Sequence, residues 1–83
     1  LNVTVKNQSR EKIEGNLTLE LVSDINVVRE TKSQLLNLEN GEQKNIKANF
    51  TPSFKGIAKV FYTFENKETG EQVSGYLWGG EVK

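Results

Sequence analysis

Apolar and polar residues alternate with a period of two over four stretches of this 83-residue chain. The apolar members of the four stretches are, in chain order, Leu1, Val3 and Val5; Leu17, Leu19 and Leu21; Ile46, Ala48 and Phe50; and Ala58, Val60, Tyr62 and Phe64. Successive side chains of a β-strand point to opposite faces, so each stretch is typical of a strand with one buried and one solvated face. The dominant pattern of the sequence therefore predicts an all-β fold with no long helix.

Segments rich in turn-forming residues separate these stretches. They cover residues 7–12, the pair Asn40-Gly41, residues 51–56 and residues 65–70. Pro52 lacks the backbone N–H group that a central strand needs. The centres of the predicted strands mostly lie about 10–15 residues apart, which is typical of an antiparallel β-sandwich.

Residues 24–38 admit two interpretations. The residues Val27, Val28, Thr31, Leu35 and Leu38 have a spacing compatible with a helix. Asp24 is also a residue type that caps helix N-termini. However, several residues of this segment are β-branched, which favours a strand, and Asn26 favours a turn. We expect a strand here, with a helix as the alternative.

The composition is typical of one small folded domain over residues 1–83. Hydrophobic residues make up 35% of the chain, the mean hydropathy is −0.57, and 11 Lys and Arg balance 11 Asp and Glu. Disordered chains usually combine low hydropathy with a high net charge, which this chain lacks. The predicted core contains Leu1, Val3, Val5, Leu17, Leu19, Leu21, Ile46, Phe50, Val60 and Tyr62.

The amino acids missing from the sequence exclude several kinds of chemistry. There is no Cys and no His, so disulfides, a thiol nucleophile, a histidine base and the commonest zinc ligands are excluded. Asp24 is the only Asp, which is too few for an Asp-rich calcium loop. The serines have no His to activate them. We therefore expect no enzyme activity, no cofactor and no metal site.

Charge and hydropathy also limit the partners. A net charge of zero provides no field for binding a phosphate backbone, so no nucleic-acid partner is expected. No apolar run approaches the roughly 18 residues of a membrane span, so we expect no direct insertion into a membrane. The sequence contains no Met and begins at Leu1, which leads us to expect a domain excised from a longer protein, or a mature domain whose leader has been removed.

The order of the motifs resembles that of a known family. Val5-Lys6-Asn7-Gln8-Ser9 is followed by Leu38-Glu39-Asn40-Gly41-Glu42, by Lys47-Ala48-Asn49-Phe50-Thr51-Pro52, and by Gly56 ahead of Ala58-Lys59-Val60-Phe61-Tyr62. From Leu1 to about Tyr76 the chain resembles the CARDB-type domains (cell-adhesion-related domains of bacteria) and similar archaeal surface-layer-associated repeats. The resemblance implies an Ig/fibronectin-like antiparallel β-sandwich of about seven strands. It also implies a non-catalytic module of a secreted or cell-surface protein, and hence an extracytoplasmic location.

Four Asn-x-Ser/Thr sequons mark candidate glycosylation sites at Asn2, Asn7, Asn16 and Asn49. Nine Asn and eleven Ser and Thr in 83 residues would give about one sequon by chance. The alternative explanation is that Asn and Thr alternate on polar strand faces, which produces Asn-x-Thr without any modification. In both cases we expect all four asparagines to be exposed to solvent.

Three aromatic residues form the candidate interaction patch. Phe61 interrupts the otherwise polar outer face of its predicted strand, and parity puts Tyr76 and Trp78 on one face of the last strand. One hypothesis places Tyr76 and Trp78 outward beside Phe61, as a platform for a sugar ring or a protein partner. The alternative places Trp78 in the sandwich core.

The leading functional hypothesis is a non-catalytic structural or interaction module that spaces domains, or takes part in adhesion or assembly. Its partners would be neighbouring domains of the same chain or another protein. One alternative is a carbohydrate-binding module that binds a polysaccharide through Phe61, Tyr76 and Trp78. Another alternative is a subunit-docking domain that pairs an edge strand with its partner.

Overall fold

The computed structural model describes residues 1–83 and consists of six β-strands with no helix. The strands are β1 (Asn2–Lys6), β2 (Ile13–Ser23), β3 (Val28–Leu38), β4 (Gln43–Lys47), β5 (Gly56–Asn66) and β6 (Gln72–Val82). All pairings are antiparallel and form a two-stranded sheet, β1-β4, and a four-stranded sheet, β3-β2-β5-β6. The all-β prediction is confirmed, but the expected count of about seven strands is wrong. No helix that could cross a membrane is present.

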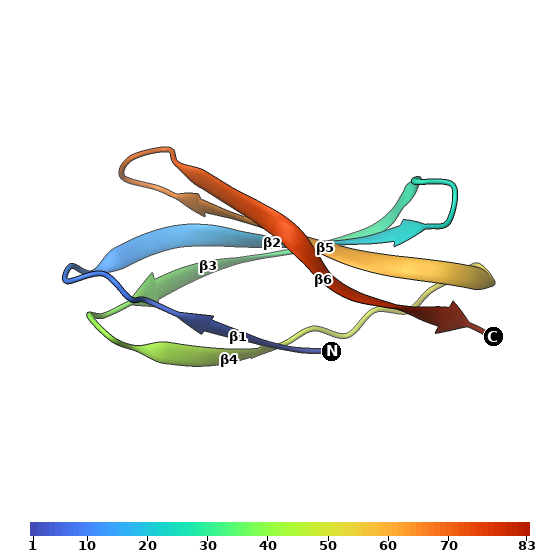
Figure 1. Cartoon of the computed structure of the whole chain (residues 1–83), viewed down its shortest axis with the longest axis horizontal. Coiled ribbons are helices and arrows are strands. Elements are labelled where there is room, and N and C mark those ends of the chain that lie inside the picture. The colour runs from blue at the N-terminus through green and yellow to red at the C-terminus, as the bar shows by residue number, and fades with distance from the viewer.

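The molecule is elongated, with extents of 43 × 22 × 16 Å. Figure 1 shows β1 and β4 together on one side, below a strongly twisted larger sheet whose strand β6 passes in front of β2 and β5. The strands of the small sheet have 5 residues each and those of the large sheet have 11. The small sheet is therefore too short and too narrow to cover the whole inner face of the large one.

The core lies between the two sheets and follows the alternation in the sequence. The buried hydrophobic residues that pack in one cluster are Val3, Leu17, Leu19, Leu21, Leu36, Ile46, Ala48, Ala58 and Val60. Of the other predicted core residues, Val5, Phe50 and Tyr62 are partly buried against this cluster. Leu1 is 39% exposed, so its assignment to the core is wrong. It precedes β1 at the end of the small sheet and borders a cavity between the sheets, so its side chain is only partly covered.

Residues 24–38 form a turn and the strand β3, which confirms the strand interpretation. Asn26 has a φ of 60°, in the left-handed region that asparagine tolerates, and its N–H donates to the carbonyl of Ser23. The inner face of β3 is apolar only where Leu36 and Leu38 are buried. This strand therefore lacks the full alternation of the other strands of its sheet.

Four glycines of the large sheet lie beneath aromatic rings, and two of them, Gly15 and Gly75, face the core. Gly15 of β2 is buried, and a Cβ there would collide with the ring of Phe64 and with the carbonyl of Glu65. Gly75 of β6 pairs with Tyr62 of β5, whose ring occupies the space of the missing side chain. The rings thus fill positions on the inner face that the glycines leave open.

Candidate interaction surface

A β-bulge in β6 determines where its aromatic side chains lie. Phe61 pairs with Tyr76 and Val60 pairs with Trp78, so one extra residue, Leu77, lies between these pairs. The extra residue changes the parity of the strand. Trp78 lies opposite the buried Val60, whereas Tyr76 lies opposite the outward-facing Phe61. The prediction that Tyr76 and Trp78 share one face is wrong, because alternation holds only within a regular ladder.

Phe61 and Tyr76 form an aromatic pair on the outer face of the large sheet, which points away from β1 and β4. Their ring centroids are 5.9 Å apart and the ring planes are inclined by 72°, an edge-to-face arrangement. Tyr76 is 59% exposed and Phe61 is half-buried. A Cβ at Gly79 would collide with the phenol group of Tyr76, so the tyrosine side chain lies along β6. We call these two residues the Phe61–Tyr76 surface.

Further apolar side chains occupy the same outer face. Val22 is only 7% exposed although no second sheet covers it, and its cross-strand neighbours are Val28 and Lys59. Ile57 is 48% exposed and has the same parity on β5 as Phe61. The Phe61–Tyr76 surface is thus accompanied by aliphatic side chains on a face that has no covering layer.

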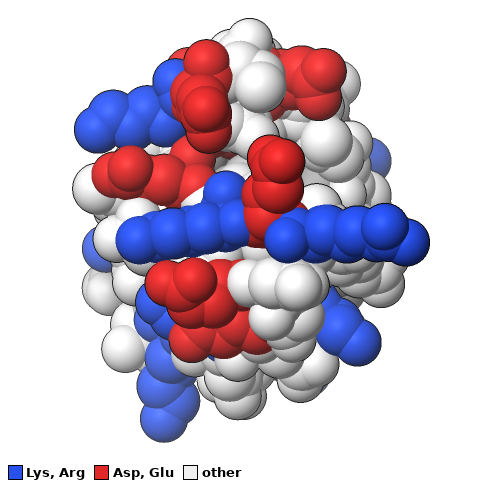
Figure 2. Space-filling model, turned by 90° about the vertical axis from the view of Figure 1, so that its left-hand side faces the viewer, with Lys and Arg blue, Asp and Glu red and all other residues white.

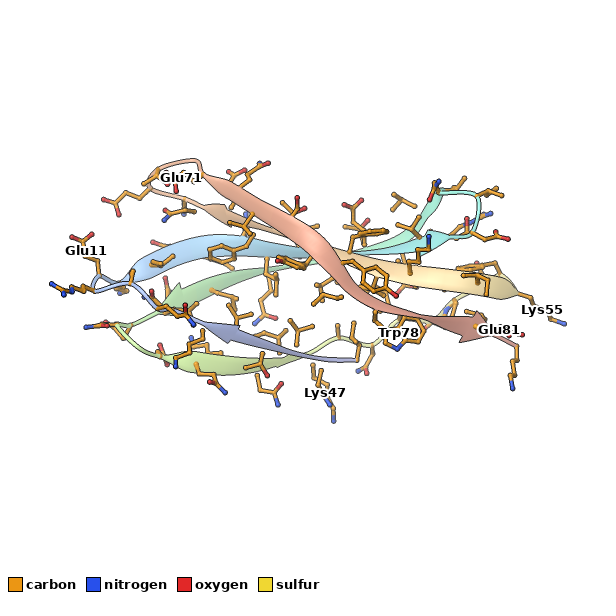
Figure 3. The ribbon with its side chains drawn as sticks, in the orientation of Figure 1. Glu11, Lys47, Lys55, Glu71, Trp78 and Glu81 are labelled. Carbon is orange, nitrogen blue, oxygen red and sulfur yellow. The ribbon has the colours of Figure 1, made fainter.

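Trp78 lies on the inner face of β6, at the open end of the sandwich. Its ring packs against Gly80 and lines a cavity of about 320 Å³ together with Leu1, Phe50 and Val82. Figure 3 shows its side chain on the side of β6 that faces the small sheet. The residue is nevertheless 40% exposed. Trp78 therefore lies on the inner face, as in the alternative that places it in the core. It lies at the edge of that core and remains partly exposed to solvent.

Asn7 differs from the other sequon asparagines, because it is only 2% exposed. The two N–H bonds of its Nδ2 group are shared among three carbonyls, those of Glu11 at 2.7 Å, Leu38 at 3.0 Å and Glu39 at 3.2 Å. Its Oδ1 atom accepts from the N–H of Ser9 at 2.9 Å and from the hydroxyl of Ser9 at 2.7 Å. The expectation that Asn7 is exposed is wrong. The side chain joins the β1–β2 connection to the end of β3.

The remaining sequon asparagines, Asn2, Asn16 and Asn49, are all exposed. Sequence reasoning missed the role of Asn7, although the spacing Asn7-x-Ser9 also fits a turn in which an Asn side chain accepts from the backbone two residues on. The amide of Asn7 that a glycan would require is already used in hydrogen bonds. Asn7 is therefore a structural residue of the fold.

Charged side chains of both signs mingle at the end of the molecule where the β1–β2, β3–β4 and β5–β6 connections meet (Figure 2). Two exposed ion pairs lie here. The Nζ atom of Lys12 is 3.8 Å from Oε1 of Glu39, and the Nζ atom of Lys67 is 3.8 Å from Oε1 of Glu14. No group of three or more acidic side chains is placed to hold a metal ion. This end presents no extended surface of a single charge.

Comparisons with known proteins relate the chain to others by structure alone. No family model matches the sequence, and neither does any curated protein. The fold is similar to part of the crystal structure of Bacteroides uniformis β-glucuronidase, with a TM-score of 0.75 and 23% identity. A calcium-binding mutant of Bacteroides uniformis β-glucuronidase 2 gives the same TM-score of 0.75 and 23% identity.

Both alignments cover 90% of this chain but 10% of the glucuronidase chain, so this chain spans about a tenth of the length of those neighbours. At this level of identity, the similarity concerns the fold and says nothing of activity. The chain is accordingly an all-β domain of two antiparallel sheets, with a fold that also occurs within a much longer bacterial protein.

Proposed function

We propose that residues 1–83 form a non-catalytic structural or interaction module of a larger secreted or cell-surface protein. The module contacts a neighbouring domain or a protein partner through the Phe61–Tyr76 surface. One observation carries this proposal: an aromatic pair lies on a sheet face without a covering layer, and its tyrosine is 59% exposed. Aromatic residues, tyrosine above all, are enriched at protein interfaces because they bury a large area at little entropic cost.

The strand order supports an Ig/fibronectin-like assignment. The four-stranded sheet β3-β2-β5-β6 packs on the pair β1-β4, and the motifs that resemble CARDB-type domains fall at strand ends and turns of this arrangement. The similarity to a tenth of a glucuronidase chain shows that this fold also occurs as one part of a much longer chain. We therefore propose that these 83 residues form a CARDB-like domain, which spaces neighbouring domains or packs against them.

The geometry favours a protein contact over a sugar platform. The two rings are inclined by 72°, so they do not form one flat surface on which a sugar ring can stack. Trp78, the third member of the expected platform, lies on the opposite face of the sheet from Tyr76. We accordingly rank the carbohydrate-binding alternative below protein contact.

The remaining parts of the proposal concern chemistry and location. The absence of His and Cys from the sequence supports a module without catalytic activity. The sequon excess and the resemblance to surface proteins support an extracytoplasmic location, with Asn2, Asn16 and Asn49 as the glycosylation candidates.

Hydroxyl-radical footprinting tests the proposed contact. The isolated domain and the longer chain that contains it are oxidised side by side, and the modification of Tyr76 is compared with that of Ile25. We expect Tyr76 to be protected at least threefold in the longer chain, because a partner domain covers it. Ile25, which is 67% exposed in the β2–β3 turn, serves as the control and keeps its reactivity.

Equal oxidation of Tyr76 in the two samples would contradict a contact with a neighbouring domain of the chain. Quenching of the Trp78 fluorescence by a polysaccharide would instead favour the carbohydrate-binding alternative. The substitution Tyr76→Ser should leave the melting temperature close to that of the parent domain, because the side chain is mostly solvated.

A further inference from the structure

The strand β1 lies at an open edge of the small sheet. Leu1 exchanges both backbone hydrogen bonds with Ala48, and the N–H of Asn7 donates to the carbonyl of Glu42. Hydrogen-bonded pairs alternate along an antiparallel ladder, so the odd-numbered residues of β1 direct their backbone groups toward β4. The backbone N–H and C=O groups of Asn2, Thr4 and Lys6 therefore point away from β4 to the open edge.

An apolar groove runs beside this open edge. It has a volume of about 440 Å³ and lies between β1 and the inner face of the large sheet. The side chains of Tyr62, Phe64, Val73 and Leu77 line it from β5 and β6, and Val5 lines it from β1. Val73 is 59% exposed although it lies on the inner face, opposite Phe64. The groove thus leaves part of the inner face of the large sheet without cover.

The opposite edge of the small sheet has a different character. Beside β4, the space between the sheets is lined by Leu17, Leu19, Ile46 and Ala48 toward the core, but the residues that β3 contributes, Lys32, Ser33 and Gln34, are all polar and exposed. A strand added beside β4 would lie over polar side chains, whereas a strand added beside β1 would cover apolar ones. Of the two edges of the small sheet, that of β1 combines unpaired backbone groups with a mainly apolar floor.

We propose that the groove beside β1 binds one extended strand of a partner polypeptide, which adds antiparallel to β1. Three residues of β1 offer backbone donors and acceptors every second position, and this pattern is complementary to an extended chain. The apolar floor requires apolar side chains at alternate positions of that strand. On the solvent side, Lys6 favours an acidic residue opposite it, because opposite charges across a strand pair attract.

A second copy of the domain does not fit this edge. The groove floor includes β6, so the large sheet extends beneath β1 and past its edge. If β1 paired with β1 of another copy, each copy would carry its own β6 into the space beneath the other β1. A stable dimer also buries roughly 600 Å² on each partner, whereas an edge of 5 residues is about 17 Å long and one strand thick. The occupant is therefore a single strand without a sheet of its own behind it.

The Phe61–Tyr76 surface has no part in this proposal, since it lies on the outer face of the large sheet. The two surfaces can therefore be tested separately. A partner bound at the groove would leave Tyr76 accessible, and a partner bound at Tyr76 would leave the backbone groups of Thr4 free.

A nuclear magnetic resonance titration with a designed peptide tests the proposal. The probe is a blocked peptide of sequence Ser-Glu-Val-Thr-Val-Thr-Ser, whose Glu lies opposite Lys6 and whose valines face the groove when it pairs antiparallel to β1. We expect slower amide hydrogen exchange at Asn2, Thr4 and Lys6 with increasing peptide. A control peptide with Lys in place of the Glu should bind at least threefold more weakly, because it places a positive charge opposite Lys6.

Two proline variants provide a matched comparison. Thr4→Pro removes a donor at the open edge of β1, and Asn45→Pro removes the equivalent donor at the outer edge of β4, since Thr4 pairs with Asn45. Neither N–H takes part in the β1–β4 ladder, and proline is tolerated at edge positions that face solvent. We expect at least a tenfold loss of peptide affinity for Thr4→Pro and less than a twofold change for Asn45→Pro.

If Thr4→Pro does not fold, Val73→Asp provides the same test, because it places a charge on the groove floor at a side chain that is 59% exposed. We expect it to weaken binding at least tenfold. Equal peptide affinity of the groove variants and the parent would overturn the proposal. Failure of the parent to bind the peptide at millimolar concentration, or concentration-dependent dimerisation through β1, would overturn it as well.

Discussion

Replacement of Asn7 by Ala should destabilise the domain by about 2–3 kcal/mol. The carbonyl of Leu38 that Asn7 bonds at 3.0 Å is buried, and its loss of a partner costs about 1–3 kcal/mol. The partners Glu11, Glu39 and Ser9 are partly buried or exposed and regain water, so each contributes only a fraction of the usual net value of about 1 kcal/mol.

Relative to the whole domain, this loss is large. At about 0.05–0.15 kcal/mol per residue, 83 residues have a free energy of unfolding of roughly 4–12 kcal/mol. A loss of about 2–3 kcal/mol then lowers the melting temperature by roughly 10–20 °C in a domain of this size. The assay is urea denaturation followed by far-UV circular dichroism and by the fluorescence of Trp78.

The control is Asn16→Ala, which changes another sequon asparagine that is exposed on β2. It should alter the free energy of unfolding by less than about 0.5 kcal/mol, as is usual for surface substitutions. The reasoning is refuted if Asn7→Ala and Asn16→Ala have the same stability. In that case the hydrogen bonds of Asn7 would be exchanged for water without cost.

Two further predictions concern the core and the sequons. Leu19→Ala should cost about 2–4 kcal/mol, because the side chain is 2% exposed in the centre of the core; a melting temperature within a degree or two of the parent would contradict the assigned register. After expression in a host that glycosylates sequons, peptide mass spectrometry should find Asn7 unmodified and glycans confined to Asn2, Asn16 and Asn49; a glycan on Asn7 in folded protein would disagree with its burial.

The sequence predicts the faces of the regular strands well, because burial follows a period of two wherever the ladder is unbroken. Leu17, Leu19 and Leu21 of β2 are all buried, as their alternation indicates. The pattern of β3 is weaker, since only Leu36 and Leu38 of its inner face are buried and the small sheet leaves the rest of that face to solvent. Because only one end of its inner face is covered, β3 shows the alternation of apolar and polar residues only at that end.

Two features of the candidate sites, the bulge in β6 and the burial of Asn7, cannot be predicted from the alternation of residues along one strand. The bulge at Leu77 depends on the register between β5 and β6, and parity counted along β6 alone gives no sign of it. The burial of Asn7 depends on carbonyls of Leu38 and Glu39, which are 31 and 32 residues away in the chain. In both cases a long-range pairing determines what the side chain does.

The glycines beneath aromatic rings restrict the order in which this domain can change during evolution. A substitution of Gly75 collides with the ring of Tyr62, which packs against the core, whereas one of Gly79 meets only the hydroxyl end of the exposed Tyr76, which can move aside. Once Tyr62 has been replaced by a smaller side chain, a substitution of Gly75 no longer meets the three atoms that lie nearest to it. The cost of the second change thus depends on whether the first has occurred, so ring and glycine form an epistatic pair. Lineages that diverge from this sequence should lose the ring before they lose the glycine.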